Sequence, residues 1–247
     1  MEYAGISEKG LIREINQDAI LMRSDVSAGL FAVADGMGGH SHGEKASQLI
    51  IKELSVWWEN FQPSSYDGEF MRMTASIKQA VEYANREIYI NYNKKVICGS
   101  TIVLLFIYKN QYCILYAGDS RVYQYRGSLW KLLTIDETWE NQIDLSVWQK
   151  KDLKNPNYGK LVNAIGVRGN MQCRILTGQL KRKDSFLLCT DGLYKFCSDR
   201  YLKLCMKKSR RIMHLEDICQ KMLDRVYGNG AGDNISFIVV KVKQDLA

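Results

Sequence analysis

The chain contains little proline and no long hydrophobic run. Only 2 of its 247 residues are proline, and the longest apolar stretch, near Ile102–Ile107, is far too short to cross a bilayer. The first ten residues lack the basic and apolar regions of a signal peptide. We therefore expect a cytoplasmic protein with no membrane-spanning segment.

Paired cysteines and clustered histidines are also missing. The seven cysteines form no C-x-x-C pair, and most lie inside apolar segments, so buried free thiols are expected rather than disulfides. His40 and His42 lie two residues apart, but no third nitrogen or sulfur ligand is near them in sequence. Exposed loop histidines are therefore a better interpretation than a zinc site.

Charge is unevenly distributed along the chain. The formal net charge of +7 is concentrated in patches such as Lys181–Lys183 and Lys207–Arg211. Such patches attract acidic or phosphorylated partners in some proteins and are solvated surface in others. Because no nucleic-acid motif and no interleaved aromatic residues accompany them, we expect no nucleic-acid partner.

What is present is the composition and patterning of a folded domain. The chain is 46% hydrophobic and 25% charged, without an internal repeat or a linker, so residues 1–247 are expected to form a single domain. Apolar residues recur at helical spacing over 44–61 and 70–88. After Gly99 the chain reads as an antiparallel meander of strands separated by turn pairs.

The second half of the chain adds an irregular excursion and further helices. Residues 136–159 are polar and irregular, with Trp139 and Trp148 as their main apolar anchors, which favours a flap or small subdomain. Strands return before helix-like segments at 200–207 and 215–226, and an apolar strand closes the chain. Two groups of strands, each followed by helices, predict an α+β fold with helices outside two packed sheets.

Five short acidic motifs carry the chemistry. Each places an aspartate beside a small or polar residue at the end of an apolar run, where strands can converge on a shared cleft. Converging carboxylates of this kind indicate a site for a hard cation. The five aspartates are Asp18, Asp35, Asp119, Asp191 and Asp233.

These motifs, in this order, resemble the metal-dependent Ser/Thr protein phosphatase family of type 2C, and its bacterial branch in particular. The matching segments are RxxNxD at 13–18, DGMGGHxxGExAS at 35–47, GDSRxY at 118–123, DSFLLCTDGL at 184–193 and GAGDNISFIVV at 230–240. The resemblance covers nearly the whole chain. It implies a four-layer α-β-β-α sandwich of two antiparallel sheets flanked by helices, as one catalytic domain over 1–247 with a flap at about 136–160.

The resemblance also implies an activity and its ligands. Members hydrolyse phosphoserine and phosphothreonine by direct attack of a water or hydroxide that bridges two Mn²⁺ or Mg²⁺ ions. By position, Asp35 bridges both ions, the carbonyl of Gly36 binds the second, and Asp191 and Asp233 bind the first. Asp119 with Asp191 matches a weaker third site. Oxygen ligands favour these ions over zinc.

Two further matched residues act on substrate and water. Arg13 matches the arginine that clamps phosphate through its planar fork, and Asp18 matches a carboxylate that orients metal waters. The chain departs from some members in carrying Gln17 instead of Glu and Met37 instead of His. The proton donor to the leaving alkoxide is therefore left unassigned, with a metal-bound water as the working choice.

The segment after the flap departs further, because Gly159 and Asn163 stand where members usually carry Asn and Arg. This leaves flap and substrate contacts open. Partners implied by the resemblance are phosphorylated proteins and an opposing Ser/Thr kinase, and a monomer is expected.

Alternatives remain open for the residues and for the whole chain. Each aspartate alone could be a turn residue or cap, and Arg13 an exposed surface cation. Together, the carboxylates would repel each other strongly without a cation, which favours the metal site. A catalytically weak member that serves as a phosphoprotein-binding regulatory module is the competing function, although no metal aspartate is lost. A two-metal nuclease lacks any motif of its own.

Overall fold

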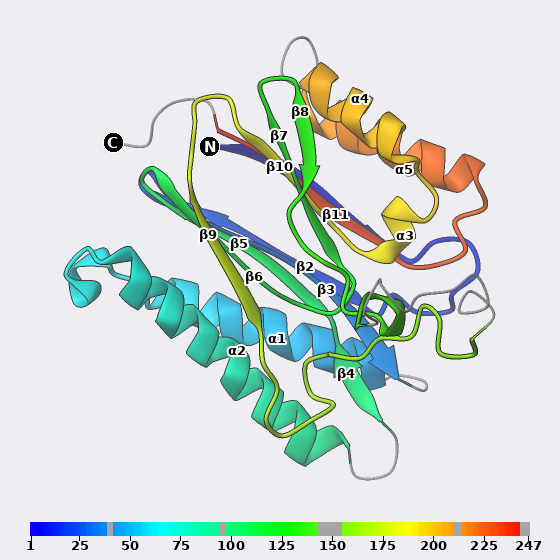
Figure 1. Ribbon diagram of the computed structural model, residues 1–247, viewed down its shortest axis with the longest axis horizontal. Coiled ribbons are helices and arrows are strands. Elements are labelled where there is room, and N and C mark those ends of the chain that lie inside the picture. Colours follow the sequence, from blue (N-terminus) through cyan, green and yellow to red (C-terminus); the bar gives the residue numbers. More distant parts are fainter. Residues whose placement is uncertain (39–41, 94–96, 143–154, 210–213, 243–247) are drawn as a thin grey trace.

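Two antiparallel sheets lie face to face in this chain, with helices on both outer sides (Figure 1). The structure is a computed structural model that describes residues 1–38, 42–93, 97–142, 155–209 and 214–242. The four layers are the α-β-β-α arrangement that the sequence predicts, so the predicted fold class is confirmed.

The first sheet joins the two ends of the chain. Its strand order is β1-β11-β10-β7-β8, and β1 pairs antiparallel with β11 from Glu2↔Lys241 to Glu8↔Ile235. This pairing places the segment after β1 beside the segment before β11. The strands are β1 (Glu2–Glu8), β7 (Arg121–Arg126), β8 (Leu129–Leu132), β10 (Ser185–Cys189) and β11 (Ile235–Lys241).

The second sheet has the order β2-β3-β5-β6-β9, with the short β4 paired to the far end of β3. In its β2–β3 hairpin, Asp18 is the register partner of Asp35. Two carboxylates that are 17 residues apart in sequence are therefore brought side by side by the ladder. The strands are β2 (Asp18–Ser24), β3 (Ala28–Gly38), β4 (Cys98–Ser100), β5 (Ile102–Tyr108), β6 (Gln111–Ala117) and β9 (Arg174–Gln179).

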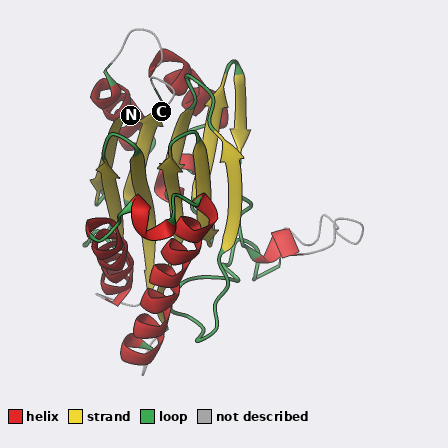
Figure 2. Cartoon of the chain, turned by 90° about the vertical axis from the view of Figure 1, so that its left-hand side faces the viewer, coloured by secondary structure: helices red, strands yellow, loops and turns green. Residues whose placement is uncertain are grey.

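The helices form the two outer layers (Figure 2). Helices α1 and α2 cover the second sheet, and α4 and α5 cover the first (Figure 1). The one-turn α3 follows the end of β10, the middle strand of the first sheet. Two 3₁₀ turns complete the described elements. The bounds are α1 (His42–Glu59), α2 (Phe70–Tyr92), α3 (Asp191–Tyr194), α4 (Asp199–Ser209), α5 (Leu215–Gly228), η1 (Pro63–Tyr66) and η2 (Trp139–Gln142).

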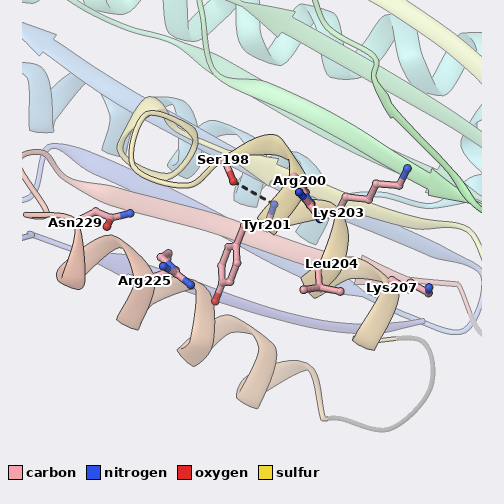
Figure 3. Close-up of a pocket in the computed structure, with 8 residues that line it drawn as sticks. All are labelled: Ser198, Arg200, Tyr201, Lys203, Leu204, Lys207, Arg225 and Asn229. Atoms are coloured by element: carbon pink, nitrogen blue, oxygen red, sulfur yellow. Dashed lines mark hydrogen bonds between the residues drawn. The ribbon is translucent and has the colours of Figure 1, made fainter.

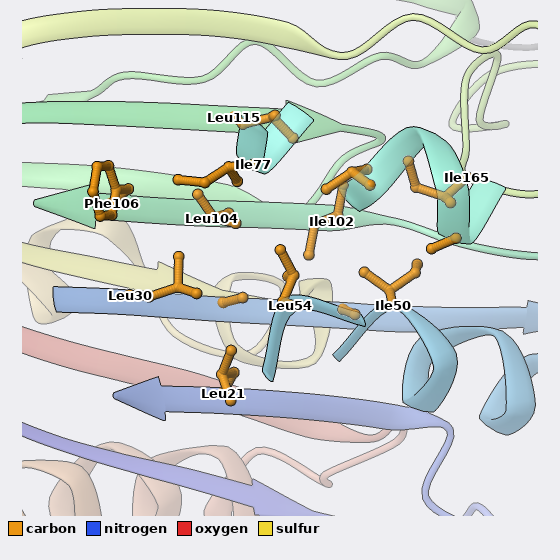
Figure 4. Close-up of a cluster of buried hydrophobic side chains, with 14 of the residues drawn as sticks. Leu21, Leu30, Ile50, Leu54, Ile77, Ile102, Leu104, Phe106, Leu115 and Ile165 are labelled. Carbon is orange, nitrogen blue, oxygen red and sulfur yellow. The ribbon is translucent and has the colours of Figure 1, made fainter. Parts of the chain in front are cut away.

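The apolar spacing read from the sequence is what packs α1 and α2 onto the second sheet. Ile50 and Leu54 of α1 and Ile77 of α2 contact Leu104 and its neighbours in one buried cluster (Figure 4). Burial of each such side chain stabilises the fold by about 1.5–3 kcal/mol. A second cluster fills the space between the sheets, and a third lies between the first sheet and α4 and α5.

Some boundaries differ from the sequence prediction. The first helix runs from His42 to Glu59, and Phe61 packs against the core after the helix has ended. His42 thus begins a helix and is half-buried, so its assignment as an exposed loop residue was wrong, and His40 lies outside the described residues. All seven cysteines are free, and six are buried, as expected.

The flap region is described only at its two ends. The segment from Trp139 forms η2, and Thr138 pairs with Leu161 in an isolated bridge, whereas Trp148 lies outside the described residues. Within the described part of the chain, no helix is long and apolar enough to cross a membrane.

Candidate metal centre

One cleft gathers residues from distant parts of the sequence at the end of the two sheets. It has a volume of about 540 Å³ and is here called the carboxylate cleft. Of the residues predicted for the site, all but Asp18 line it. They are Arg13, Asp35, Gly36, Asp119, Asp191 and Asp233.

Each lining aspartate is delivered by a different local structure. Asp35 lies within β3, Asp119 in the turn between β6 and β7, and Asp191 at the start of α3. Asp233 comes two residues before β11. Because these segments meet only when both sheets have formed, the cleft is a product of the tertiary fold.

Close backbone packing requires glycine at two of these positions. A Cβ atom on Gly36 would lie 2.2 Å from the carbonyl oxygen of Gly43, and one on Gly192 would lie 1.8 Å from that of Asn234. These distances are far below van der Waals contact. The absence of a side chain at Gly192 lets α3 pack directly on the segment that carries Asp233.

Asp18 lies beside Asp35 but is more deeply enclosed, with only 7% of its surface exposed. Its Oδ2 accepts a hydrogen bond of 3.0 Å from the Thr190 hydroxyl, whereas its buried Oδ1 has no hydrogen-bond partner among the described residues. Burial raises the pKa of Asp18 to about 7, and the negative charges of Asp191 and Asp233 add to the rise. An orphaned buried carboxylate oxygen calls for a cation or an ordered water.

The neighbouring carboxylates are perturbed in the same direction. Burial, followed by the charges of Asp18 and Asp191, raises the pKa of Asp35 well above its ordinary value. Burial and the charge of Asp191 raise the pKa of Asp119 to about 6, against a lowering effect of Lys195. The ionised forms of Asp18, Asp35 and Asp119 are therefore poorly solvated and repel each other, and a bound cation would stabilise them.

Two side-chain cations already neutralise part of this charge. The Arg13 guanidinium donates from Nε and Nη2 to the two oxygens of Asp233, at 2.8 and 2.9 Å. Lys195 donates from Nζ to Asp191 Oδ2 at 2.5 Å. Sequence reasoning proposed Arg13 for phosphate and did not find Lys195, although its position four residues after Asp191 signals an ion pair along a helix.

The carboxylates of the cleft are suitable ligands for a divalent ion, but their side chains do not converge on one point. Among the residues that the structure describes, no three His, Cys, Asp or Glu side chains converge closely enough to hold one ion. Two of the candidate ligands, Asp191 and Asp233, face cations instead. The oxygen donors, the charge repulsion and the Asp18 oxygen that lacks a partner among the described residues all suit Mg²⁺ or Mn²⁺. These ions retain several waters and need few protein ligands.

A second group of residues, which sequence reasoning missed, holds the cleft in shape. Asn234 donates from Nδ2 to the carbonyls of Lys9 and Ile15, and its Oδ1 accepts from the Gln17 backbone amide. These bonds fasten the loop that carries Arg13 to the segment that carries Asp233. Asparagine after Asp233 in the GDN motif was the available signal.

Hydroxyl groups of neighbouring residues form hydrogen bonds with the backbone of Asp35. The Asp35 amide donates to Thr101 Oγ1, the Thr101 amide donates to the Asp35 carbonyl, and the Thr101 and Ser120 hydroxyls are 2.7 Å apart. The Ser100 hydroxyl donates to the Asp35 carbonyl as well. The Ser100 and Ser120 hydroxyls are therefore engaged in holding the backbone around Asp35 in place.

The departure at Asn163 also has a structural role. Its side-chain amide donates to Glu137 Oε2 at 2.7 Å, the same oxygen that accepts from the Gly118 amide. Arg174 donates to the other oxygen of Glu137. Asn163 thus turns inward and anchors the chain after the flap to the turn that carries Asp119.

Comparison with known proteins agrees with this geometry. The family model for protein phosphatase 2C matches residues 13–229. The chain is 27% identical over 244 residues to the serine/threonine phosphatase stp of Listeria welshimeri, covering 95% of this chain and 93% of the relative.

Solved structures show the same fold. The serine/threonine phosphatase PstP/Ppp of Mycobacterium tuberculosis superposes with a TM-score of 0.84 at 24% identity, covering 98% of this chain and 99% of that one. The crystal structure of the PstP catalytic domain in complex with 2 manganese ions gives a TM-score of 0.80 at 24% identity, with 98% of each chain covered. With a family model that matches most of its length and a matching fold, this chain belongs to the protein phosphatase 2C family.

Proposed function

We propose that this protein is a metal-dependent Ser/Thr protein phosphatase that uses two Mn²⁺ or Mg²⁺ ions in the carboxylate cleft. The observation that carries the proposal is the meeting of Asp35, Asp119, Asp191 and Asp233 around one cleft that also contains an arginine. Membership of the family, relatives named serine/threonine phosphatases and the two manganese ions of the PstP structure support it.

The proposed roles of the ligands are those that the resemblance to the family implies. Asp35 and the carbonyl of Gly36 would hold the ions from the second sheet, and Asp191 and Asp233 from the first. Asp119 with Asp191 would hold a third. When bound, two such ions supply an activated water and neutralise the phosphoryl oxygens during in-line displacement.

Two residues of the chain itself orient the reactants. Arg13 has a fork that matches two phosphate oxygens as well as it matches the two oxygens of Asp233. A phosphoryl group entering the cleft would therefore take over these donors. Oδ1 of Asp18 has no hydrogen-bond partner among the described residues. It would accept a hydrogen bond from a water and orient that water for attack on the phosphoryl group.

The wider setting follows as part of the same proposal. Substrates are phosphorylated proteins, an opposing Ser/Thr kinase would supply them, and the enzyme would act in the cytoplasm as a monomer. Residues 1–247 form one catalytic domain with a flap at about 136–160. The regulatory-module alternative is not favoured, because every matched metal aspartate is present and the relatives are named as phosphatases.

The test is release of phosphate from a phosphothreonine peptide, measured with Mn²⁺ and with EDTA. Turnover is expected to require the ion and to fall by at least about 10³-fold in Asp35→Asn and Asp191→Ala. Asp217→Asn, which changes an exposed aspartate on α5, is the matched control and should keep wild-type activity. Folded wild-type protein with bound Mn²⁺ and no turnover would contradict the proposal.

A further inference from the structure

A second hollow, separate from the carboxylate cleft, lies on the outer helical layer. It has a volume of about 550 Å³ and lies against α4 and α5 (Figure 3). Four of its lining residues are cations, and none of the described lining residues is Asp or Glu. We call this hollow the basic groove; the cations are Arg200, Lys203, Lys207 and Arg225.

Three cations of α4 lie close together, and their mutual repulsion lowers the stability of the helix. Arg200, Lys203 and Lys207 follow each other at spacings of three and four residues, which places them on one face of α4. Like charges at these spacings repel. Among the described residues none of the three forms an ion pair, so their charge is available to a ligand.

Nearby acidic side chains are engaged elsewhere. Asp199 accepts a hydrogen bond of 2.9 Å from Trp130 Nε1, and Asp224, in an adjoining hollow, accepts one of 2.8 Å from Gln220. The Arg225 guanidinium lies over the Tyr201 ring at 4.6 Å. These hydrogen bonds leave both carboxylates charged, but the four lining cations outnumber them, so the groove keeps a net positive charge.

The groove also offers apolar contact. Leu204 is 45% exposed and lies between Lys203 and Lys207 of α4, and the Tyr201 ring forms part of the same wall (Figure 3). A ligand that combined carboxylates with an apolar residue would match both features. An acidic peptide segment has this chemistry, and the surrounding charge is complementary to it.

The chain links the groove closely to the carboxylate cleft. Lys195 lines the cleft and Ser198 lines the groove, and three residues of chain span at most about 11 Å between Cα atoms. An extended peptide covers this distance with about four residues. One substrate segment could therefore occupy both places at once.

We propose that the basic groove docks an acidic segment of the phosphoprotein substrate, a few residues from the phosphorylated side chain. That the occupant is a phosphoprotein substrate rests on the proposed function. That the groove binds an acidic peptide does not depend on it. The groove would select among phosphoproteins through contacts that the reaction itself does not need.

The test compares two phosphothreonine peptides that differ only in a segment of four Glu or four Gln placed about five residues from the phosphothreonine. Arg200→Gln/Lys203→Gln is the variant, and Lys52→Gln/Arg86→Gln, which removes one exposed Lys and one exposed Arg from α1 and α2, is the matched control. Each exposed charge contact contributes roughly a factor of two. With two cations removed, the preference for the Glu peptide in kcat/KM is expected to fall about fourfold in the variant, mostly through KM, and to persist in the control.

Two further measurements separate docking from damage. Hydrolysis of p-nitrophenyl phosphate, which cannot reach the groove, should be the same in wild type and variant. Fluorescence anisotropy of the unphosphorylated Glu peptide in EDTA should show binding to wild type that weakens in the variant and in high salt.

Each failure has a distinct meaning. Equal turnover of both peptides by wild type, with no binding of the Glu peptide, would overturn the docking proposal and leave the phosphatase function standing. An equal loss with p-nitrophenyl phosphate would also overturn it. Binding of the Glu peptide that depends on Arg200 and Lys203, in a protein without turnover, would support docking and contradict the proposed function.

Discussion

Asp18→Asn is expected to stabilise the metal-free protein at alkaline pH. The pKa of Asp18 rises from 3.8 to about 7 on folding, and each pKa unit corresponds to about 1.4 kcal/mol. Ionised Asp18 therefore costs the folded state about 4 kcal/mol above pH 7. Asparagine can still accept from Thr190, but its new amide would face the place where Oδ1 lacks a partner, at a cost of about 1–2 kcal/mol.

The free energy of unfolding of Asp18→Asn should exceed that of the wild type by roughly 2–3 kcal/mol above pH 7, and this difference should depend on pH. Because the pKa of Asp18 is higher in the folded state than in the unfolded state, the protonated side chain favours folding. The folded wild type keeps its full stability below pH 3.8 and loses about 4 kcal/mol of it as the pH rises through about 7. The advantage of the variant should thus be absent near pH 3.5, grow between pH 4 and 7, and be constant above pH 7.

Thermal unfolding in EDTA at several pH values measures this difference. For a chain of this length the gain corresponds to roughly 5–10 °C in Tm at pH 8, and the exposed Asp217→Asn variant should show no such trend. Saturating Mn²⁺ should narrow the gap, since the ion relieves the same repulsion. A metal-free Asp18→Asn protein no more stable than wild type at pH 8 would refute the electrostatic account of this site.

Three further outcomes follow from the cleft. Lys195→Gln removes the cation that faces Asp191 and should raise the affinity for Mn²⁺ several-fold in calorimetry; unchanged or weaker binding would show that Lys195 does not compete with the ion. Arg13→Ala should lower kcat/KM for a phosphothreonine peptide by about 10- to 100-fold through lost charged hydrogen bonds, and wild-type kinetics would remove Arg13 from the phosphate site. Gly192→Ala should lower the free energy of unfolding by about 2 kcal/mol or more, because its Cβ would lie 1.8 Å from the Asn234 carbonyl oxygen; urea unfolding at wild-type denaturant concentrations would contradict this.

The elements that the sequence predicted well are those with a strong local period. Ile77, Val81, Ala84 and Ile88 repeat at helical spacing, and all four are buried in α2. The meander from Ile102 was readable because turn pairs separate its apolar runs. The short β4 was not predicted as a separate strand, because three residues carry too little periodicity to distinguish a strand from a loop.

The candidate site was predicted as a set of residues and not as a set of contacts. The motif pattern pointed to the acidic residues, and the structure places them around one cleft with Asp18 beside it. The pairing of Arg13 with Asp233 joins residues 220 positions apart. No local pattern indicates such a contact, since it exists only because β1 and β11 lie side by side.

The sequence by itself determined the α+β layers, the free cysteines and the five aspartates, because apolar period, residue type and motif order are properties of short segments. Only the tertiary structure decided which cation faces which carboxylate, that one buried oxygen of Asp18 has no hydrogen-bond partner among the described residues, and that four cations line a groove near the cleft. These features depend on the packing of distant segments, in which burial and charge act together over distances that sequence spacing does not encode.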